Sequence, residues 1–218
     1  MEGKTLTDQA YRQLRKDIVT GKYNPGEKLR IEHVKQTYGF GATPLREALY
    51  RLSSDGFVQV KGQRGFSVAD VSLAELHDIT NLRVALEGLA LTQSLKQSDD
   101  NWESRVVATF YHLTKAESQE EPDINEWELR NKDFHEALIS CCDSPWLMRF
   151  LEIIYDQHKR YRNIARVARS DQRDIHAEHK AICDAALAKD IKALLEASEA
   201  HVVRTAEVTH KVLTEKID

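Results

Sequence analysis

Apolar residues recur at helical spacing in three short segments of the first 70 residues, and this period predicts three helices. They are expected over 6–19, 31–38 and 44–55. Thr43 and Pro44 stand at the start of the third segment, and these residue types are preferred at an N-cap and at the first helical position. The third helix is therefore expected to begin directly after Thr43.

The pattern changes after the third segment, where two short runs rich in β-branched and aromatic residues flank a glycine-containing turn. The runs cover 57–60 and 66–68, with the turn at 61–65 between them. Such a pair of runs predicts a β-hairpin. Three helices followed by a hairpin is the element order of a winged helix-turn-helix, whose third helix enters the DNA major groove.

Beyond residue 70 the apolar positions repeat at helical spacing over much longer segments, with Ser144 and Asp190 as expected N-caps. This pattern predicts an all-α bundle. The expected fold class is mainly α: an N-terminal winged helix-turn-helix with a small β-hairpin wing, followed by a C-terminal all-α helical bundle. The helices of the bundle are expected over 73–95, 101–118, 125–142, 145–168, 173–188 and 191–214.

Charge and glycine content change at the same place along the chain. The 218 residues carry a formal net charge of −4. Residues 1–70 hold 12 Lys and Arg against 8 Asp and Glu, whereas residues 71–218 hold 19 against 27. Eight of the nine glycines also precede residue 70. Together with the winged-helix pattern, this change predicts a basic DNA-binding domain over 1–70 and an acidic all-α domain over 71–218.

Other features of the composition bear on the compartment. No stretch approaches the roughly 18 apolar residues of a membrane span, and the N-terminus lacks the apolar core of a signal peptide. The three cysteines, Cys141, Cys142 and Cys183, form no disulfide framework, which is typical of a reducing compartment. A cytoplasmic protein without membrane contact is expected.

The winged-helix interpretation selects candidate DNA contacts. Thr43 and Arg46 lie at the start of the third helix, where side chains meet base edges or phosphates, and an arginine fork pairs with guanine O6 and N7. Lys61, Gln63 and Arg64 in the hairpin turn are expected to hold phosphates, which sets register rather than sequence preference. The alternative is that Arg46 pairs with a neighbouring acid and that the hairpin only packs.

Histidines in the second part offer a candidate metal site. Asn131 and His135 are four residues apart and so share one helix face. The short turn at 189–190 makes the helices around it antiparallel, and His179 and His201 lie about equally far from this turn, hence at similar height. Three imidazoles from three helices suit Zn²⁺ or Ni²⁺.

A rival grouping lies within a single helix. His176, His179 and Cys183 share one face at positions i, i+3 and i+7. Spacing alone leaves both groupings open.

Five segments of the first 70 residues, among them Thr43-Pro-Leu-Arg-Glu-Ala-Leu and Arg64-Gly-Phe-Ser-Val, carry a family pattern. They resemble the GntR family of bacterial transcription regulators over essentially all of residues 5–70. The resemblance implies a homodimer that reads a pseudo-palindromic operator in double-stranded DNA. Ala42 stands where this family often has a base-contacting arginine, so the usual operator consensus is not expected here.

The second part resembles the FCD effector domain of the FadR subfamily, which implies that 71–218 is an effector-binding and dimerisation domain. That resemblance implies metal ligands at His135, His179 and His201 and at position 131. Many such domains have an aspartate at this fourth position, whereas this chain has Asn131, which exchanges an anionic ligand for a neutral carbonyl. The matching residues are Leu82-Arg83, Glu87, Asn131, Phe134-His135, Glu178-His179, Ile182 and His201.

A metal with three histidine ligands has open positions, which a small carboxylate effector could occupy while Arg83 holds its other end. Arg162 is a second candidate cation. Arg83 could instead pair with Glu87, and Arg162 could simply be solvated. Segments 127–131 and 160–162 are similar to one branch of the subfamily. This similarity implies a C5 dicarboxylate or a related hydroxy acid as the effector.

These expectations together predict a DNA-binding transcription regulator and repressor that a small carboxylate controls through the helical domain. The linker at 69–72 is the expected hinge. Two alternatives remain: a metal-dependent enzyme that uses the three histidines, and a DNA-binding protein whose helical domain only dimerises.

Overall fold

The structure is a computed structural model and describes residues 5–62, 65–119, 123–165 and 173–217. Its contacts divide the chain into two compact units. One comprises the described residues of Met1–Leu76 and Asp156–Arg166, and the other those of His77–Tyr155 and Val167–Asp218. No described helix is both long and apolar enough to cross a membrane. The domain boundary near residue 70 stays a prediction.

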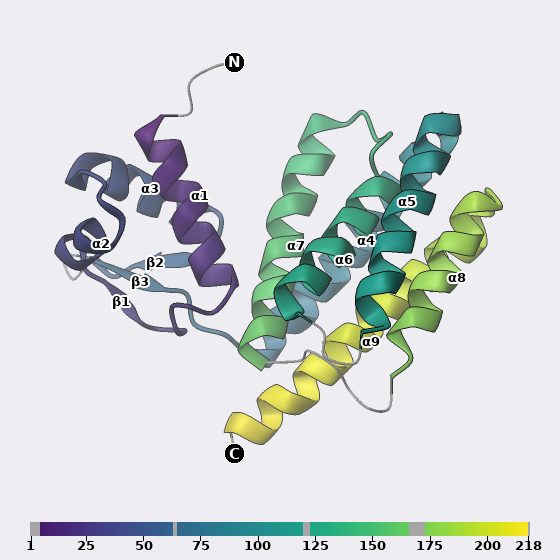
Figure 1. The fold of residues 1–218 in the computed structure, drawn as a ribbon. Helices are drawn as coiled ribbons and strands as arrows, with labels where there is room; N and C mark the ends of the chain where they lie inside the picture. Colours follow the sequence, from purple (N-terminus) through teal and green to yellow (C-terminus); the bar gives the residue numbers. More distant parts are fainter. Residues whose placement is uncertain (1–4, 63–64, 120–122, 166–172, 218) are drawn as a thin grey trace. The chain divides into compact units, whose positions relative to one another are not determined.

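In the described part of residues 1–70 the first unit has three helices and a three-stranded antiparallel sheet of order β1-β3-β2 (Figure 1). Phe66 pairs with Val60 on one side and with Leu29 on the other. The hairpin is confirmed, whereas the two-residue β1 was not predicted. The elements are α1 (Leu6–Val19), β1 (Lys28–Leu29), α2 (Ile31–Tyr38), α3 (Ala42–Ser54), β2 (Val58–Val60) and β3 (Phe66–Val68).

The start of α3 differs from the prediction. The helix begins at Ala42 with Gly41 as its N-cap, so the assignment of Thr43 as N-cap was wrong. Pro44 fits at the third helical position because the first backbone N–H groups of a helix have no partner within the helix. The inner face of α3 is nonetheless as expected, because Leu45, Leu49 and the other apolar residues of its stripe are fully buried.

The last turns of α7 (Pro145–Ala165) belong to the first unit. Asp156 forms a salt bridge of 2.8 Å with Arg15, and the Asn163 amide donates to the backbone carbonyl of Val19 at 2.7 Å. The buried Arg160 guanidinium donates to the carbonyl of Ala69. The segment expected to act as a hinge is therefore held by hydrogen bonds from a helix.

A buried carboxylate joins α1 to α2 in this unit. Asp17 accepts hydrogen bonds from Lys22 at 2.6 Å and from the Tyr38 hydroxyl at 2.5 Å. Burial alone would raise the pKa of Asp17, but these hydrogen bonds outweigh it, and the pKa lies below its usual value. Because the pKa is lowered on folding, this carboxylate contributes stability above the unfolded-state pKa of about 3.9. The contribution is lost as the pH falls through the folded-state pKa.

An Asp17→Asn variant is therefore expected to lose about 1–3 kcal/mol of unfolding free energy at neutral pH, since it weakens charge-assisted hydrogen bonds of a buried group. Urea unfolding followed by circular dichroism measures this loss, with the exposed Glu32→Gln as the matched control. The difference between Asp17→Asn and the unmutated protein should shrink below about pH 4. Equal stability of the two proteins at pH 7 would contradict the assignment.

The second unit is built from helices, which confirms the mainly α fold class (Figure 1). α5 packs against α6 and α8, and α8 packs against α9. Trp102, Phe134 and Ile182 are among the fully buried residues of its core. The helices that contribute to this unit are α4 (Leu73–Gln97), α5 (Asp100–Glu117), α6 (Ile124–Leu138), α7, α8 (Ile175–Leu187) and α9 (Ile191–Ile217).

Polar caps set several helix boundaries of the bundle. Asp190 accepts from the backbone N–H of Ala193, and Ser144 from that of Leu147, so both predicted caps are confirmed. α6 ends at Leu138 rather than at residue 142. The chain turns there, with the Cys142 N–H bonded to the carbonyl of Ile139, and apolar residues continue through the turn because the core covers it.

Candidate functional site

The outer face of α3 carries the candidate base contacts. Thr43 and Arg46 are exposed, as the predicted groove contacts must be. Among the described residues no carboxylate pairs with Arg46, whereas its neighbour Glu47 accepts a hydrogen bond from Thr7 at 2.7 Å. The Arg46 guanidinium is thus accessible at the surface. The alternative, an ion pair between Arg46 and a neighbouring acid, does not occur among the described residues.

The wing lies beside this helix within the same unit. Tyr50 of α3 packs edge-on against Phe66 of β3, with ring centroids 5.0 Å apart. Lys61 is exposed at the start of the hairpin turn, and its N–H bonds to the carbonyl of Gly65. The other two predicted phosphate contacts, Gln63 and Arg64, lie outside the described residues.

Three buried histidines from three helices converge in the second unit. His135 comes from α6, His179 from α8 and His201 from α9, and each exposes 6% or less of its surface. Their ring centroids lie 4.7 to 5.6 Å apart, and one ring nitrogen from each lies within 4.8 Å of the others. Two nitrogens on one zinc ion are at most about 4 Å apart, so small ring rotations suffice to close this group around an ion.

The chain positions two of these histidines through the ends of their helices. Asp174 caps α8 by accepting from the N–H of Ala177, which fixes the start of this helix. Between α8 and α9 the chain turns at Lys189, which has a positive φ of 56°. The Lys189 ammonium lies 4.4 Å from the centroid of the Trp102 ring and 2.9 Å from Glu103. These contacts hold the turn, so His179 and His201 face each other across the pair of helices.

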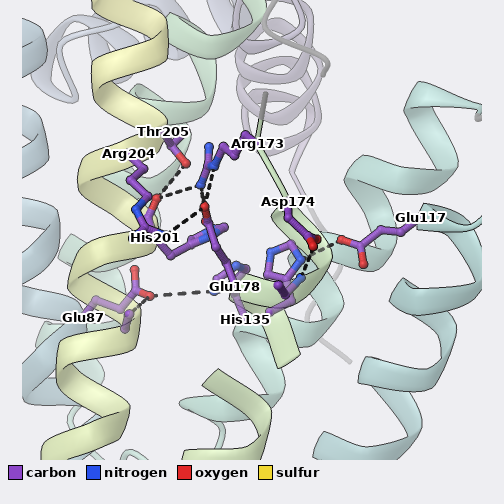
Figure 2. A network of polar contacts seen from close by, with 12 residues as sticks. Glu87, Glu117, His135, Arg173, Asp174, Glu178, His201, Arg204 and Thr205 are labelled. Atoms are coloured by element: carbon purple, nitrogen blue, oxygen red, sulfur yellow. Dashed lines mark hydrogen bonds and ion pairs between the residues drawn. The ribbon is translucent and has the colours of Figure 1, made fainter. Parts of the chain in front are cut away.

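The Nδ1 atom of each ring faces a glutamate whose side chain is at most 9% exposed. Figure 2 labels these three glutamates, Glu87, Glu117 and Glu178. The His179 Nδ1 lies 2.7 Å from Glu117, and the His201 Nδ1 lies 2.9 Å from Glu178. For His135 the separation from Glu87 is longer, at 3.7 Å. A carboxylate at Nδ1 favours the tautomer with the proton on that nitrogen, which leaves the Nε2 lone pair for another partner.

The carboxylate of Glu178 also anchors two arginines. Arg173 binds it through two guanidinium nitrogens at 2.8 and 2.5 Å, and Arg204 lies 3.4 Å from it (Figure 2). Arg173 also donates to the backbone carbonyl of His201 at 3.1 Å. The start of α8 and the middle of α9 are therefore tied together beside the histidine group.

Burial and neighbouring charges adjust two pKa values at this site. Burial lowers the pKa of His201 well below its usual value, and the positive charges of His179, His135 and nearby arginines add to the effect. Burial works in the other direction on Glu117, but hydrogen bonds from His179 and His176 outweigh it and lower the pKa of this carboxyl. A neutral imidazole beside an ionised carboxylate is the state that binds metal ions.

The remaining predicted site residues have other partners. The Asn131 amide is buried and donates to the Tyr155 hydroxyl at 3.3 Å. Arg83 is buried, bonds to Glu87 at 3.0 Å and stacks over the Tyr155 ring, so it forms the ion pair considered as the alternative. Arg162 is buried but belongs to the first unit, whereas the histidines belong to the second.

The rival grouping within α8 separates in the structure. His176 points its Nδ1 at Glu117, 2.9 Å away, and stacks on Phe110. Cys183 is part of the apolar core, and burial raises its pKa to about 11. Of this grouping only His179 joins the three-histidine group.

Sequence reasoning assigned no part in orienting the histidines to Glu117, Glu178 or Arg173. Glu178 adjoins His179 in sequence, which was a usable indication. Glu117 ends α5 and lies 62 positions from His179, so no local spacing marks it. Arg173 lies before α8 and could be recognised only from the folded chain.

Family comparisons match both parts of the chain. The family model described as bacterial regulatory proteins, gntR family, matches residues 6–68, and the model of the FCD domain matches residues 78–204. The two matched segments correspond to the winged-helix elements and to the helices that carry the histidines.

Individual relatives extend over nearly the whole chain. The HTH-type transcriptional regulator BphR from Paraburkholderia xenovorans (strain LB400) is 38% identical over 212 residues, which are 95% of this chain and 86% of BphR. The HTH-type transcriptional repressor GlaR from Escherichia coli (strain K12) is 33% identical over 216 residues, 96% of this chain and 98% of GlaR. The structure of E. coli McbR/YncC has the same fold, with a TM-score of 0.83 at 20% identity over 95% of this chain and 98% of that one. These relatives are regulators rather than enzymes.

Proposed function

The chain belongs to the gntR family of bacterial regulatory proteins and is a DNA-binding transcriptional regulator, and on that premise we propose that it is a homodimeric repressor controlled through a metal site. In this proposal α3 reads the operator through Thr43 and Arg46, and Lys61, Gln63 and Arg64 of the wing hold phosphates. Similarity to the repressor GlaR supports repression, rather than activation, as the effect on transcription.

The observation that carries the metal site is the group of three buried imidazoles. His135, His179 and His201 present nitrogen donors to one centre, and the His179 Nε2 has no hydrogen-bond partner among the described residues. An unsatisfied polar atom at 0% exposure is costly unless something binds it. Zn²⁺ or Ni²⁺ fits this nitrogen donor set.

The charge of the site favours an anionic effector. Three neutral imidazoles and the Asn131 carbonyl would leave the two positive charges of the ion without an anionic ligand. A small carboxylate that completes the coordination would compensate this charge, with a C5 dicarboxylate or a related hydroxy acid as the expected class. Arg83 is the candidate for the other end of the effector, and Arg162 is a weaker one because it belongs to the first unit.

Control of DNA binding requires that the effector prefer one arrangement of the dimer. A ligand with equal affinity for two arrangements shifts neither. With the domain boundary placed at residue 70, the proposal is that effector binding changes the spacing of the two DNA-binding domains through the linker at 69–72.

Metal analysis of the purified protein tests the site. The unmutated protein is expected to bind about one zinc ion per chain. His210→Ala, which removes an exposed histidine of α9, is the control and should bind as much. His135→Ala and His179→Ala should bind less than about a tenth of that, because each removes one of three ligands. If both variants retain the metal, the site is not where we propose, and the bundle is left with dimerisation as its role.

A further inference from the structure

We propose that Glu117 is the positioning residue of the metal site and that His176 holds it in place. This inference rests on the metal site proposed above. The two oxygens of the Glu117 carboxylate are divided between two imidazoles of α8: Oε1 lies 2.7 Å from the His179 Nδ1, and Oε2 lies 2.9 Å from the His176 Nδ1. One carboxylate therefore joins the end of α5 to two positions one turn apart on α8.

The bond to Glu117 determines which nitrogen of His179 faces the centre. With Nδ1 committed to the carboxylate, Nε2 is the atom left for a metal, and it has no hydrogen-bond partner among the described residues. Ring orientation and tautomer are set together, as in carboxylate–histidine–metal arrangements generally. His179 is fully buried, so no water replaces the carboxylate as a fixed acceptor without rearrangement.

His176 serves this arrangement without being a ligand. Its side chain is 44% exposed, its ring stacks on Phe110 with centroids 5.9 Å apart, and Phe110 in turn packs against the buried Phe134. The imidazole is thus held by the aromatic packing and occupies the second oxygen of Glu117. That contact prevents the carboxylate from rotating away from His179.

Glu117 also supplies negative charge that position 131 lacks. Asn131 contributes no anion to the inner coordination sphere, whereas a carboxylate bonded to the Nδ1 of a ligand raises the basicity of Nε2. The charge of Glu178 is shared with two guanidinium groups, Arg173 and Arg204. The Glu117 carboxylate contacts the imidazoles of His176 and His179, and through His179 it acts on the nitrogen left for the ion.

Zinc affinity, measured by competition with a chromophoric chelator, tests this role. Glu117→Ala is expected to raise the zinc Kd about 10–100-fold. Glu117→Gln should have a smaller effect, because its amide oxygen still accepts from Nδ1. His176→Phe keeps the stack on Phe110 but removes the second support, and we expect a rise of a few-fold. Asp100→Asn, at an exposed carboxylate of the same helix, is the matched control and should leave the Kd unchanged.

A second readout separates positioning from stability. The visible absorption of the Co²⁺-loaded protein reports ligand geometry, and it should change in Glu117→Ala and Glu117→Gln but not in Asp100→Asn. If Glu117→Ala does not fold, the Kd and spectrum of Glu117→Gln decide the question. Wild-type Kd and spectrum in the Glu117 variants, together with loss of zinc in His179→Ala, would overturn this inference and leave the metal site intact. Unchanged zinc binding in His179→Ala would overturn the metal site itself.

Discussion

An Arg46→Ala protein is expected to lose about 1–3 kcal/mol of operator binding in each half-site, and so about 2–6 kcal/mol as a dimer. This magnitude is the contribution of an arginine fork to guanine in the major groove. Arg46 is exposed on the outer face of α3, and no carboxylate among the described residues forms an ion pair with it. Fluorescence anisotropy at one fixed salt concentration measures the loss, with an operator that the unmutated protein has selected from random duplexes.

Two controls identify the kind of contact that is lost. Arg105→Ala removes one positive charge from an exposed position of α5 and should leave operator affinity nearly unchanged. Lys61→Ala should weaken all duplexes about equally and reduce the salt dependence by about one unit of slope in each half-site, and so by about two units for the dimer, as the loss of phosphate contacts does. Undiminished operator binding by Arg46→Ala would rule out the groove assignment.

The bundle is expected to lose about 3–5 kcal/mol of unfolding free energy on Phe134→Ala, because the substitution leaves a cavity in a close-packed core. Phe134 is fully buried, and its ring centroid lies 5.6 Å from that of His135 and 5.8 Å from that of His179. The cavity therefore opens directly beside two proposed ligands. Chemical unfolding followed by tryptophan fluorescence measures the loss, since all three tryptophans lie beyond residue 100.

Phe150→Ala provides the comparison at an exposed position. Its ring is 50% exposed on α7, so its removal should change the unfolding free energy by no more than about 0.5 kcal/mol. If the two variants lose equal stability, the packing around the histidines does not have the role assigned to Phe134.

The elements of this protein could be read from the sequence wherever local chemistry defines them. α1 and α2 have the predicted bounds because glycine-containing turns follow both and the apolar period is regular between them. β1 was missed because two residues have no period, and its pairing with Phe66 is a long-range contact. The start of α3 was misplaced because a proline is tolerated anywhere in the first helical turn, so it does not mark a single position.

The candidate site divides along the same line. The meeting of His179 and His201 could be anticipated because a short turn fixes the height of both. Helix periodicity put Asn131 and His135 on one face of their helix. The contact of Glu117 with His179, by contrast, depends on how α5 packs against α8, which no spacing in the sequence encodes. Arg83 pairs with Glu87, four residues along the same helix, because both side chains are buried and an unpaired buried charge is costly.

Because α8 and α9 meet at the turn around Lys189, the number of residues between His179 and His201 determines whether the two side chains meet. His201 follows His179 by 22 residues, and most of these are helical on either side of the turn. One inserted residue after the turn would rotate every later side chain of α9 by about 100° about the helix axis and carry it about 1.5 Å along that axis. His201 would then leave the group although no side chain had been replaced. In this protein the number of residues in a connection is therefore as much a part of the site as the identity of the histidines.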